Sequence, residues 1–135
     1  MVPEIGALEA WDAIMGFQFE NLVLSNLEAI RKRAGIGNVP VVNAGPYWQE
    51  KTQRREACQI DLLIRTSQSL HVFETKLRQK IDASAIDEVK GKVRRLKLPR
   101  DLSVRTGLIY HGELAPGVES ADCFDHLIPF ADLTR

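Results

Sequence analysis

The spacing of apolar residues along the chain predicts two amphipathic helices. The first covers residues 11 to about 34, and the second covers residues 84 to about 98, where Pro99 ends it. In both segments apolar residues recur at intervals of three or four. Each helix therefore has one apolar face that can pack on a core.

The remaining pattern is that of strands. Strands are predicted in four segments rich in β-branched or aromatic residues, at 47–52, 58–66, 70–77 and 103–110. Residues 38–46 contain two prolines and a glycine, which predicts a loop, and residues 124–130 could add a short edge strand. The order of helix, three strands, helix and strand predicts an α/β sandwich, in a single domain spanning residues 1–135.

The composition says more about the expected location of the protein than about its function. The chain has 44% hydrophobic residues and a formal net charge of zero, without an apolar run long enough for a membrane span. Cys58 and Cys123 lie far apart and outside any zinc-site spacing, and the N-terminus lacks a secretory pattern. We therefore expect a cytoplasmic protein with reduced cysteines and no membrane partner.

The predicted strands at 58–66 and 70–77 carry the candidate catalytic residues. If they form a hairpin that turns at Ser67, Asp61 lies directly opposite Glu74 and Gln59 lies opposite Lys76, with all four side chains on one face. A register shifted by one residue would separate the carboxylates. The opposite face is then expected to carry Ile60, Leu62, Ile64, Phe73 and Thr75.

Two facing carboxylates repel each other, and a divalent cation removes that cost. The pair therefore predicts a site for Mg²⁺ or Mn²⁺, with Lys76 placed to assist an attacking water or a phosphate. The alternative is a surface salt bridge between Glu74 and Lys76, which the aspartate at the pairing position makes less attractive. Glu20 falls in the core-facing stripe of the first helix, where it is either a further ligand or the partner of an arginine.

These residues resemble the PD-(D/E)XK nuclease superfamily, whose pattern is a helical Glu, a strand Asp and a Glu-x-Lys. Glu20, Asp61 and the Glu74–Lys76 tripeptide match it, and Ile60 replaces the proline that names the motif. The resemblance implies a restriction-endonuclease-like sandwich with a central mixed sheet flanked by helices. It also implies metal-dependent hydrolysis of nucleic-acid phosphodiester bonds. In that case Glu20, Asp61 and Glu74 are the metal ligands, Lys76 is the catalytic lysine and Gln59 is an auxiliary group.

The segments FQFENLV at 17–23 and CQID at 58–61, with a late Phe124 and Asp125, also resemble the C-terminal domain of predicted bacterial and archaeal AAA-type ATPases. That resemblance implies an ATPase domain as a partner. The chain has no Gly-x-x-x-x-Gly-Lys-Ser/Thr motif, so nucleotide hydrolysis is not its own activity. The sequence leaves open whether the chain is a fragment of such an ATPase and whether it forms a homo-oligomer.

Basic residues concentrate in the middle of the chain, with fourteen Lys/Arg against seven Asp/Glu between residues 51 and 105. The predicted nucleic-acid-binding residues lie on the second helix and are Lys90, Lys92, Arg94, Arg95 and Lys97. Solvated charge on an amphipathic helix is the alternative, and no aromatic ladder predicts base stacking. The two functional hypotheses are a metal-dependent DNA nuclease and a non-catalytic module for DNA binding or ATPase docking.

Overall fold

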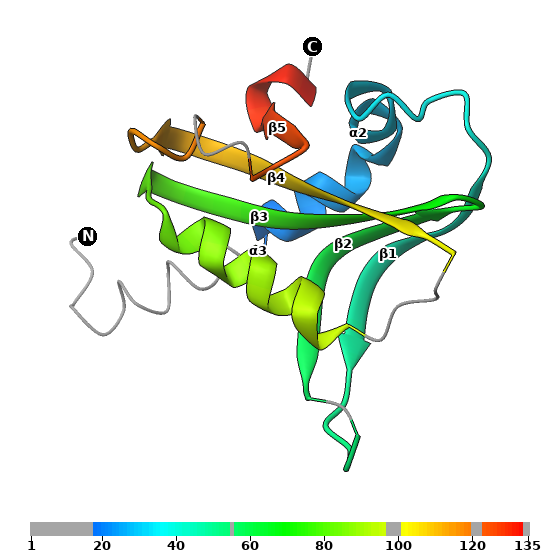
Figure 1. Ribbon diagram of the computed structural model, residues 1–135. Helices are drawn as coiled ribbons and strands as arrows, with labels where there is room; N and C mark the ends of the chain where they lie inside the picture. Colours follow the sequence, from blue (N-terminus) through cyan, green and yellow to red (C-terminus); the bar gives the residue numbers. More distant parts are fainter. Residues whose placement is uncertain (1–17, 55, 97–100, 120–122, 134–135) are drawn as a thin grey trace.

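The computed structural model describes residues 18–54, 56–96, 101–119 and 123–133, which build a five-stranded mixed sheet (Figure 1). The strands lie in sequence order and are β1 (Val41–Gln49), β2 (Cys58–Thr66), β3 (Ser69–Ile81), β4 (Ser103–Leu114) and β5 (His126–Pro129). The first three are antiparallel to one another, and β3, β4 and β5 are parallel.

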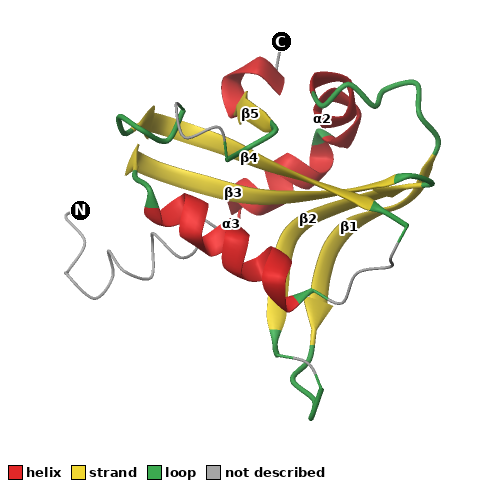
Figure 2. Ribbon diagram, in the orientation of Figure 1, coloured by secondary structure: helices red, strands yellow, loops and turns green. Residues whose placement is uncertain are grey.

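Helices cover both faces of this sheet (Figure 2). On one face lies α3 (Ser84–Arg95), which packs on β2 and β3. The other face carries helical residues 18–25 and α2 (Leu27–Arg33), and a 3₁₀ turn, η1 (Phe130–Leu133), follows β5. In the part of the chain that the structure describes, no helix is long and apolar enough to cross a membrane.

Each helical layer has its own buried core. The core cluster under α3 includes Ile60, Val72, Val89 and Leu108. The cluster on the opposite face includes Phe19, Ile30, Leu62, Phe73 and Ile109. The predicted α/β sandwich and its element order are therefore confirmed, since alternate residues of the central strands feed two separate apolar layers.

The bounds of several elements differ from those that the sequence predicts. The predicted loop at 38–46 is wrong from Val41 onward, because β1 begins there and includes Pro46, which an edge strand tolerates. The first helix is interrupted at Asn26, whose side chain donates to the Leu22 carbonyl at 2.7 Å and competes with the helical bonds. Its predicted start at residues 11–17 lies outside the described residues.

A bulge in β2 alters the predicted distribution of its side chains. Gly45 of β1 pairs with Leu63, but Tyr47 pairs with Ile60, so β2 contains one extra residue between these points. Ile60 consequently joins the core cluster under α3, whereas Leu62 belongs to the other cluster. The expectation that Ile60, Leu62 and Ile64 share a face is therefore wrong for Ile60.

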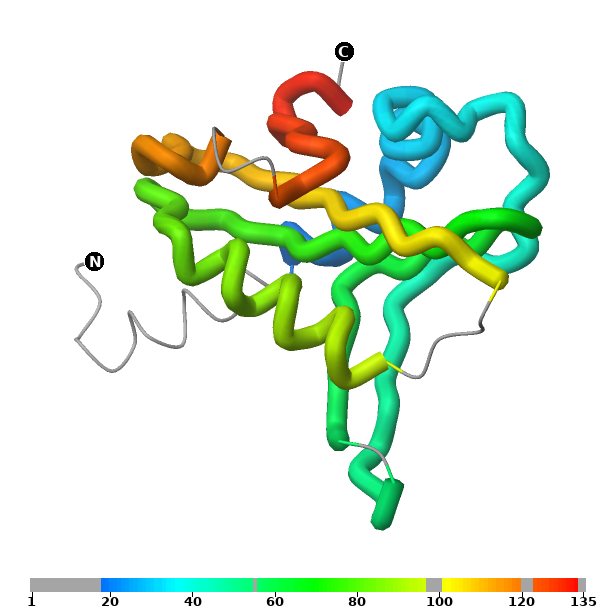
Figure 3. The backbone as a smooth tube through the Cα atoms, viewed as in Figure 1, coloured from blue at the N-terminus to red at the C-terminus, as the bar shows by residue number. Residues whose placement is uncertain are grey.

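The pairing of β2 with β3 stops next to this bulge. The predicted pairs Arg65–Leu70 and Leu63–Val72 are confirmed, and the ladder continues to Leu62–Phe73. Beyond it, β1 and β2 run away from β3 toward their connecting loop (Figure 3). The sheet is thus open at the level of Asp61, which is the next residue of β2.

The core on the α2 side depends on a glycine. Phe73 is fully buried, and its ring lies 5.9 Å from that of His126, with the two planes 19° apart. Gly107 is its register partner on β4, and a Cβ atom at Gly107 would lie 2.5 Å from two carbons of the Phe73 ring. The position therefore has no room for a methyl group.

We predict that Gly107→Ala lowers the free energy of unfolding by about 1–3 kcal/mol, because the Phe73 ring must move. Gly91→Ala is the matched control, since its Cβ would meet only the guanidinium groups of Arg95, at 3.5 Å, and Arg94, at 3.8 Å. This change in the interior of α3 should add about 0.5–1 kcal/mol. Urea denaturation measures both values, and equal stabilities of the two variants would contradict the packing described.

Candidate functional site

Asp61 bridges the opening between β2 and β3 with its side chain. Its Oδ2 atom accepts hydrogen bonds from the Thr75 backbone N–H at 2.9 Å and from the Thr75 hydroxyl at 3.1 Å. These bonds replace the missing backbone ladder at this point of the sheet. The carboxylate is therefore fixed beside β3, next to the strand residue Glu74.

Two further carboxyl groups, those of Glu20 and Glu74, interact electrostatically with Asp61. Burial, followed by the charge of Asp61, raises the pKa of Glu20, which belongs to the helical residues 18–25. Burial, again followed by Asp61, raises the pKa of Glu74 to about 7. Three acids thus converge at the opening of the sheet, and the crowding of like charges is one reason why two of them hold their protons more tightly.

Two lysines partly compensate this negative charge. Lys92 of α3 donates to Glu74 Oε2 at 2.7 Å. Lys76 Nζ lies 3.9 Å from Glu74 Oε1 and donates to Glu88 Oε2 at 2.6 Å. Burial by itself lowers the pKa of Lys92, but the hydrogen bond and charge of Glu74 outweigh it and raise that pKa.

The position of Lys92 differs from the exposed basic flank that the sequence predicts. It lies on the inner side of α3 because it shares helical spacing with the buried residues Ala85, Val89 and Leu96. Its side chain is only 18% exposed and points to Glu74. Lys92 therefore belongs to the acid cluster and not to the outer surface of the helix.

The other residues of the predicted basic surface lie farther out. Lys90, Arg94 and Arg95 are exposed on α3, and Lys97 lies outside the described residues. Gln59 is exposed on β2, and its predicted pairing with Lys76 falls beyond the β2–β3 pairs that the structure records. The structure thus brings together Glu20, Asp61, Glu74 and Lys76 but leaves Gln59 at the rim.

Glu20 and Asp61 of the acid cluster line a cavity of about 560 Å³ between the two helical layers. The residues around it include Glu20, Asp61, Gln59, Lys92, Arg95 and Trp48. Trp48 and Glu88 were not singled out by the sequence, because neither an exposed strand position nor an ion pair between a helix and a strand has a local sequence pattern. A polar wall with both signs of charge distinguishes this cavity from an ordinary gap in packing.

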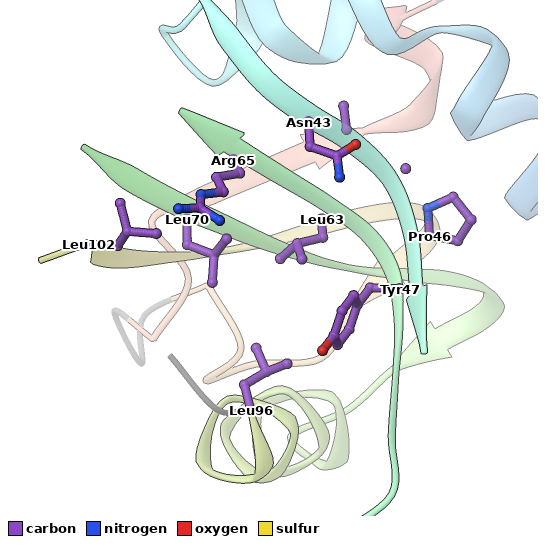
Figure 4. A pocket seen from close by; sticks show the side chains of 10 residues that line it. Asn43, Pro46, Tyr47, Leu63, Arg65, Leu70, Leu96 and Leu102 are labelled. Carbon is purple, nitrogen blue, oxygen red and sulfur yellow. The ribbon is translucent and has the colours of Figure 1, made fainter. Parts of the chain in front are cut away.

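A second cavity, of about 440 Å³, lies beside β1 and the end of α3 (Figure 4). Its wall includes Tyr47, Leu63, Leu70, Leu96 and Leu102, with Arg65 and Asn43 at the polar end. None of the converging acids contributes to it. The candidate chemistry therefore belongs to the first cavity, although more leucine side chains line the second.

Oxygen donors from one or two carboxylates, completed by waters and phosphate, are the usual ligands of Mg²⁺. The convergence on Asp61 fits such an ion in its chemistry. Among the residues that the structure describes, no group of three or more His, Cys, Asp or Glu side chains is arranged to hold a metal ion. One reason is visible, since Lys92 occupies Glu74 Oε2 and Thr75 occupies Asp61 Oδ2.

Comparison with known proteins finds one informative likeness. No family model and no curated protein matches the chain. Among solved structures, that of a repair endonuclease from Pyrococcus abyssi superposes with a TM-score of 0.50 at 21% sequence identity. The likeness covers 95% of this chain but only 47% of the endonuclease. Together with the mixed sheet and its flanking helices, it establishes a nuclease-like fold of the restriction-endonuclease type.

Proposed function

We propose that this domain hydrolyses phosphodiester bonds of DNA with the help of Mg²⁺ or Mn²⁺. The observation that carries the proposal is the convergence of Glu20 and Glu74 on Asp61, at the opening of a nuclease-like sheet. Buried carboxyl groups that repel one another are costly for a structural core, whereas they suit a cation. The repair endonuclease of similar fold agrees with this class of chemistry.

Asp61, Glu74 and Glu20 would hold the ion, which when bound supplies positive charge for the phosphate at the reacting bond. Lys76 Nζ lies 3.9 Å from Glu74 Oε1, so its ammonium group would lie close to a phosphate bound to that ion and could orient the attacking water. Glu88 Oε2 accepts a hydrogen bond from the same ammonium group at 2.6 Å and so holds it toward α3. Lys76 thus acts on water and phosphate, while the acids act on the ion.

Lys92 has a distinct role in this scheme. Its hydrogen bond to Glu74 stabilises the carboxylate before a cation arrives. If Glu74 held an ion, Lys92 would lose this partner and could meet an anionic substrate in the cavity that it already lines. The lysine would then exchange one anion for another and not remain a buried, unpaired charge.

The alternative function is a non-catalytic nuclease-fold module for DNA binding or for docking to an ATPase domain. One observation favours it, which is that both Lys76 and Lys92 already have carboxylate partners. In that case the polar network only holds α3 on the sheet. An AAA-type ATPase domain as the partner rests on the sequence resemblance at residues 17–23 and 58–61, and it too remains a proposal.

We predict that millimolar Mg²⁺ or Mn²⁺ raises the melting temperature of the protein by mass action. Asp61→Asn should abolish this gain while leaving the metal-free protein as stable as the wild type or more so. The asparagine keeps an oxygen for the Thr75 N–H and removes the charge that crowds Glu20 and Glu74. Thermal unfolding with and without metal measures both effects.

The metal-induced rise in melting temperature should also depend on pH. Glu74 holds a proton up to about pH 7, and a cation must displace that proton, so the gain should increase as pH rises through about 7. Glu113→Gln removes one exposed carboxylate on β4 and should behave as the wild type does. A metal gain that persists in Asp61→Asn would contradict the assignment of Asp61 as a ligand.

We predict that Lys76→Met lowers the rate of cleavage of plasmid or branched DNA by about 10²-fold or more. The metal-induced stabilisation should be retained. Methionine keeps most of the buried aliphatic volume but not the ammonium group. Lys80→Met on the exposed end of β3 is the matched control and should cleave normally. Full activity in Lys76→Met would exclude the lysine, and inactive wild-type protein without a metal response would favour the non-catalytic module.

A further inference from the structure

Trp48 is a large aromatic side chain that faces solvent beside the acid cluster. It is 63% exposed, on the edge strand β1, and it lines the same cavity as Glu20, Asp61 and Lys92. A single exposed apolar residue is ordinary on a protein surface. This one differs because its neighbours in the cavity include both the proposed metal ligands and cations.

The backbone at Trp48 is held rigidly. Trp48 pairs with Gln59 of β2, and the next residue, Gln49, is only 6% exposed. The Gln49 side-chain amide donates to the Glu56 carbonyl at 2.8 Å and to the Arg95 carbonyl at 2.7 Å. Through these bonds the end of β1 is fixed to the C-terminal turn of α3, so the indole is placed in advance relative to the acids.

An available cation lies on the α3 side of the same cavity. The Arg95 side chain is 46% exposed, and its Nε lies 3.8 Å from Glu56, whose own side chain is 79% exposed. Such a long contact between exposed groups contributes little and is easily replaced. Arg95 can therefore exchange Glu56 for a phosphate, in the cavity that also presents the indole.

An aromatic ring and a guanidinium group that line one cavity match the chemistry of an unpaired nucleotide. The faces of bases in a duplex are covered by their neighbours, whereas a single strand leaves them free to stack on protein rings. We propose that Trp48 stacks on an unpaired base, with Arg95 on a neighbouring phosphate, and that the site takes single-stranded or splayed DNA. The cleavage of that strand rests on the proposed function, but its binding does not.

The test measures binding of a labelled oligothymidylate and of a duplex of equal length, in EDTA so that no cleavage can occur. The wild type should prefer the single strand. Trp48→Leu should weaken single-strand binding roughly 5- to 150-fold and leave duplex binding nearly unchanged. Trp48→Phe should restore most of the loss, because phenylalanine can stack and leucine cannot.

Val42→Ala is the matched control, since Val42 is 64% exposed on the same strand but does not line the cavity. It should bind both DNA forms as the wild type does, and urea denaturation should show that all variants are folded. Single-strand binding that is equal in wild type and Trp48→Leu, or an equal loss for both DNA forms, would overturn the proposal. Because the binding test contains no metal, that result would not bear on the proposed cleavage. Conversely, a protein without cleavage activity would not bear on the result of the binding test.

Discussion

The crowding of two carboxyl groups, Glu20 and Glu74, around the carboxylate of Asp61 is the constraint on which the rest of the site depends. Asp61 can reach Thr75 because the β2–β3 ladder ends at Leu62 and Phe73, next to the bulge in β2. The same opening lets Glu20 approach from one helical layer, while Glu74 meets Lys92 from the other. A regular sheet at this level would separate the two layers and keep their charges apart.

The surrounding structure makes this crowding tolerable without eliminating it. Lys92 neutralises Glu74, and Glu88 holds Lys76, so α3 supplies one partner to each charged residue of the β3 motif. The pKa of Glu74 nevertheless stays raised, to about 7, since burial and Asp61 outweigh the lysine. Such a balance gives a cation or a proton a place to bind, which a fully neutralised ion-pair network would not.

The sequence predicted most of the fold because periodicity reports how each segment is buried. Strand 58–66 matches β2 in both bounds, and the hairpin register followed from the short turn at Ser67. The bulge that moves Ile60 to the α3 side could not be predicted, because it depends on how β1 pairs with β2. The exposure of Trp48 was missed for the same reason, since it is set by packing between distant elements. The inward position of Lys92, by contrast, was predictable from its helical spacing with Val89 and Leu96.

Anomalous diffraction from a crystal soaked in Mn²⁺ tests the central claim most directly, because it locates the ion without any substrate. The account predicts a single strong peak between Asp61 and Glu74, with Glu20 directed to it and Lys92 moved away from Glu74. Density that shows no ion at this position, with Lys92 still bonded to Glu74 at saturating Mn²⁺, would contradict it. The converging acids would then be a structural network in a fold of nuclease type.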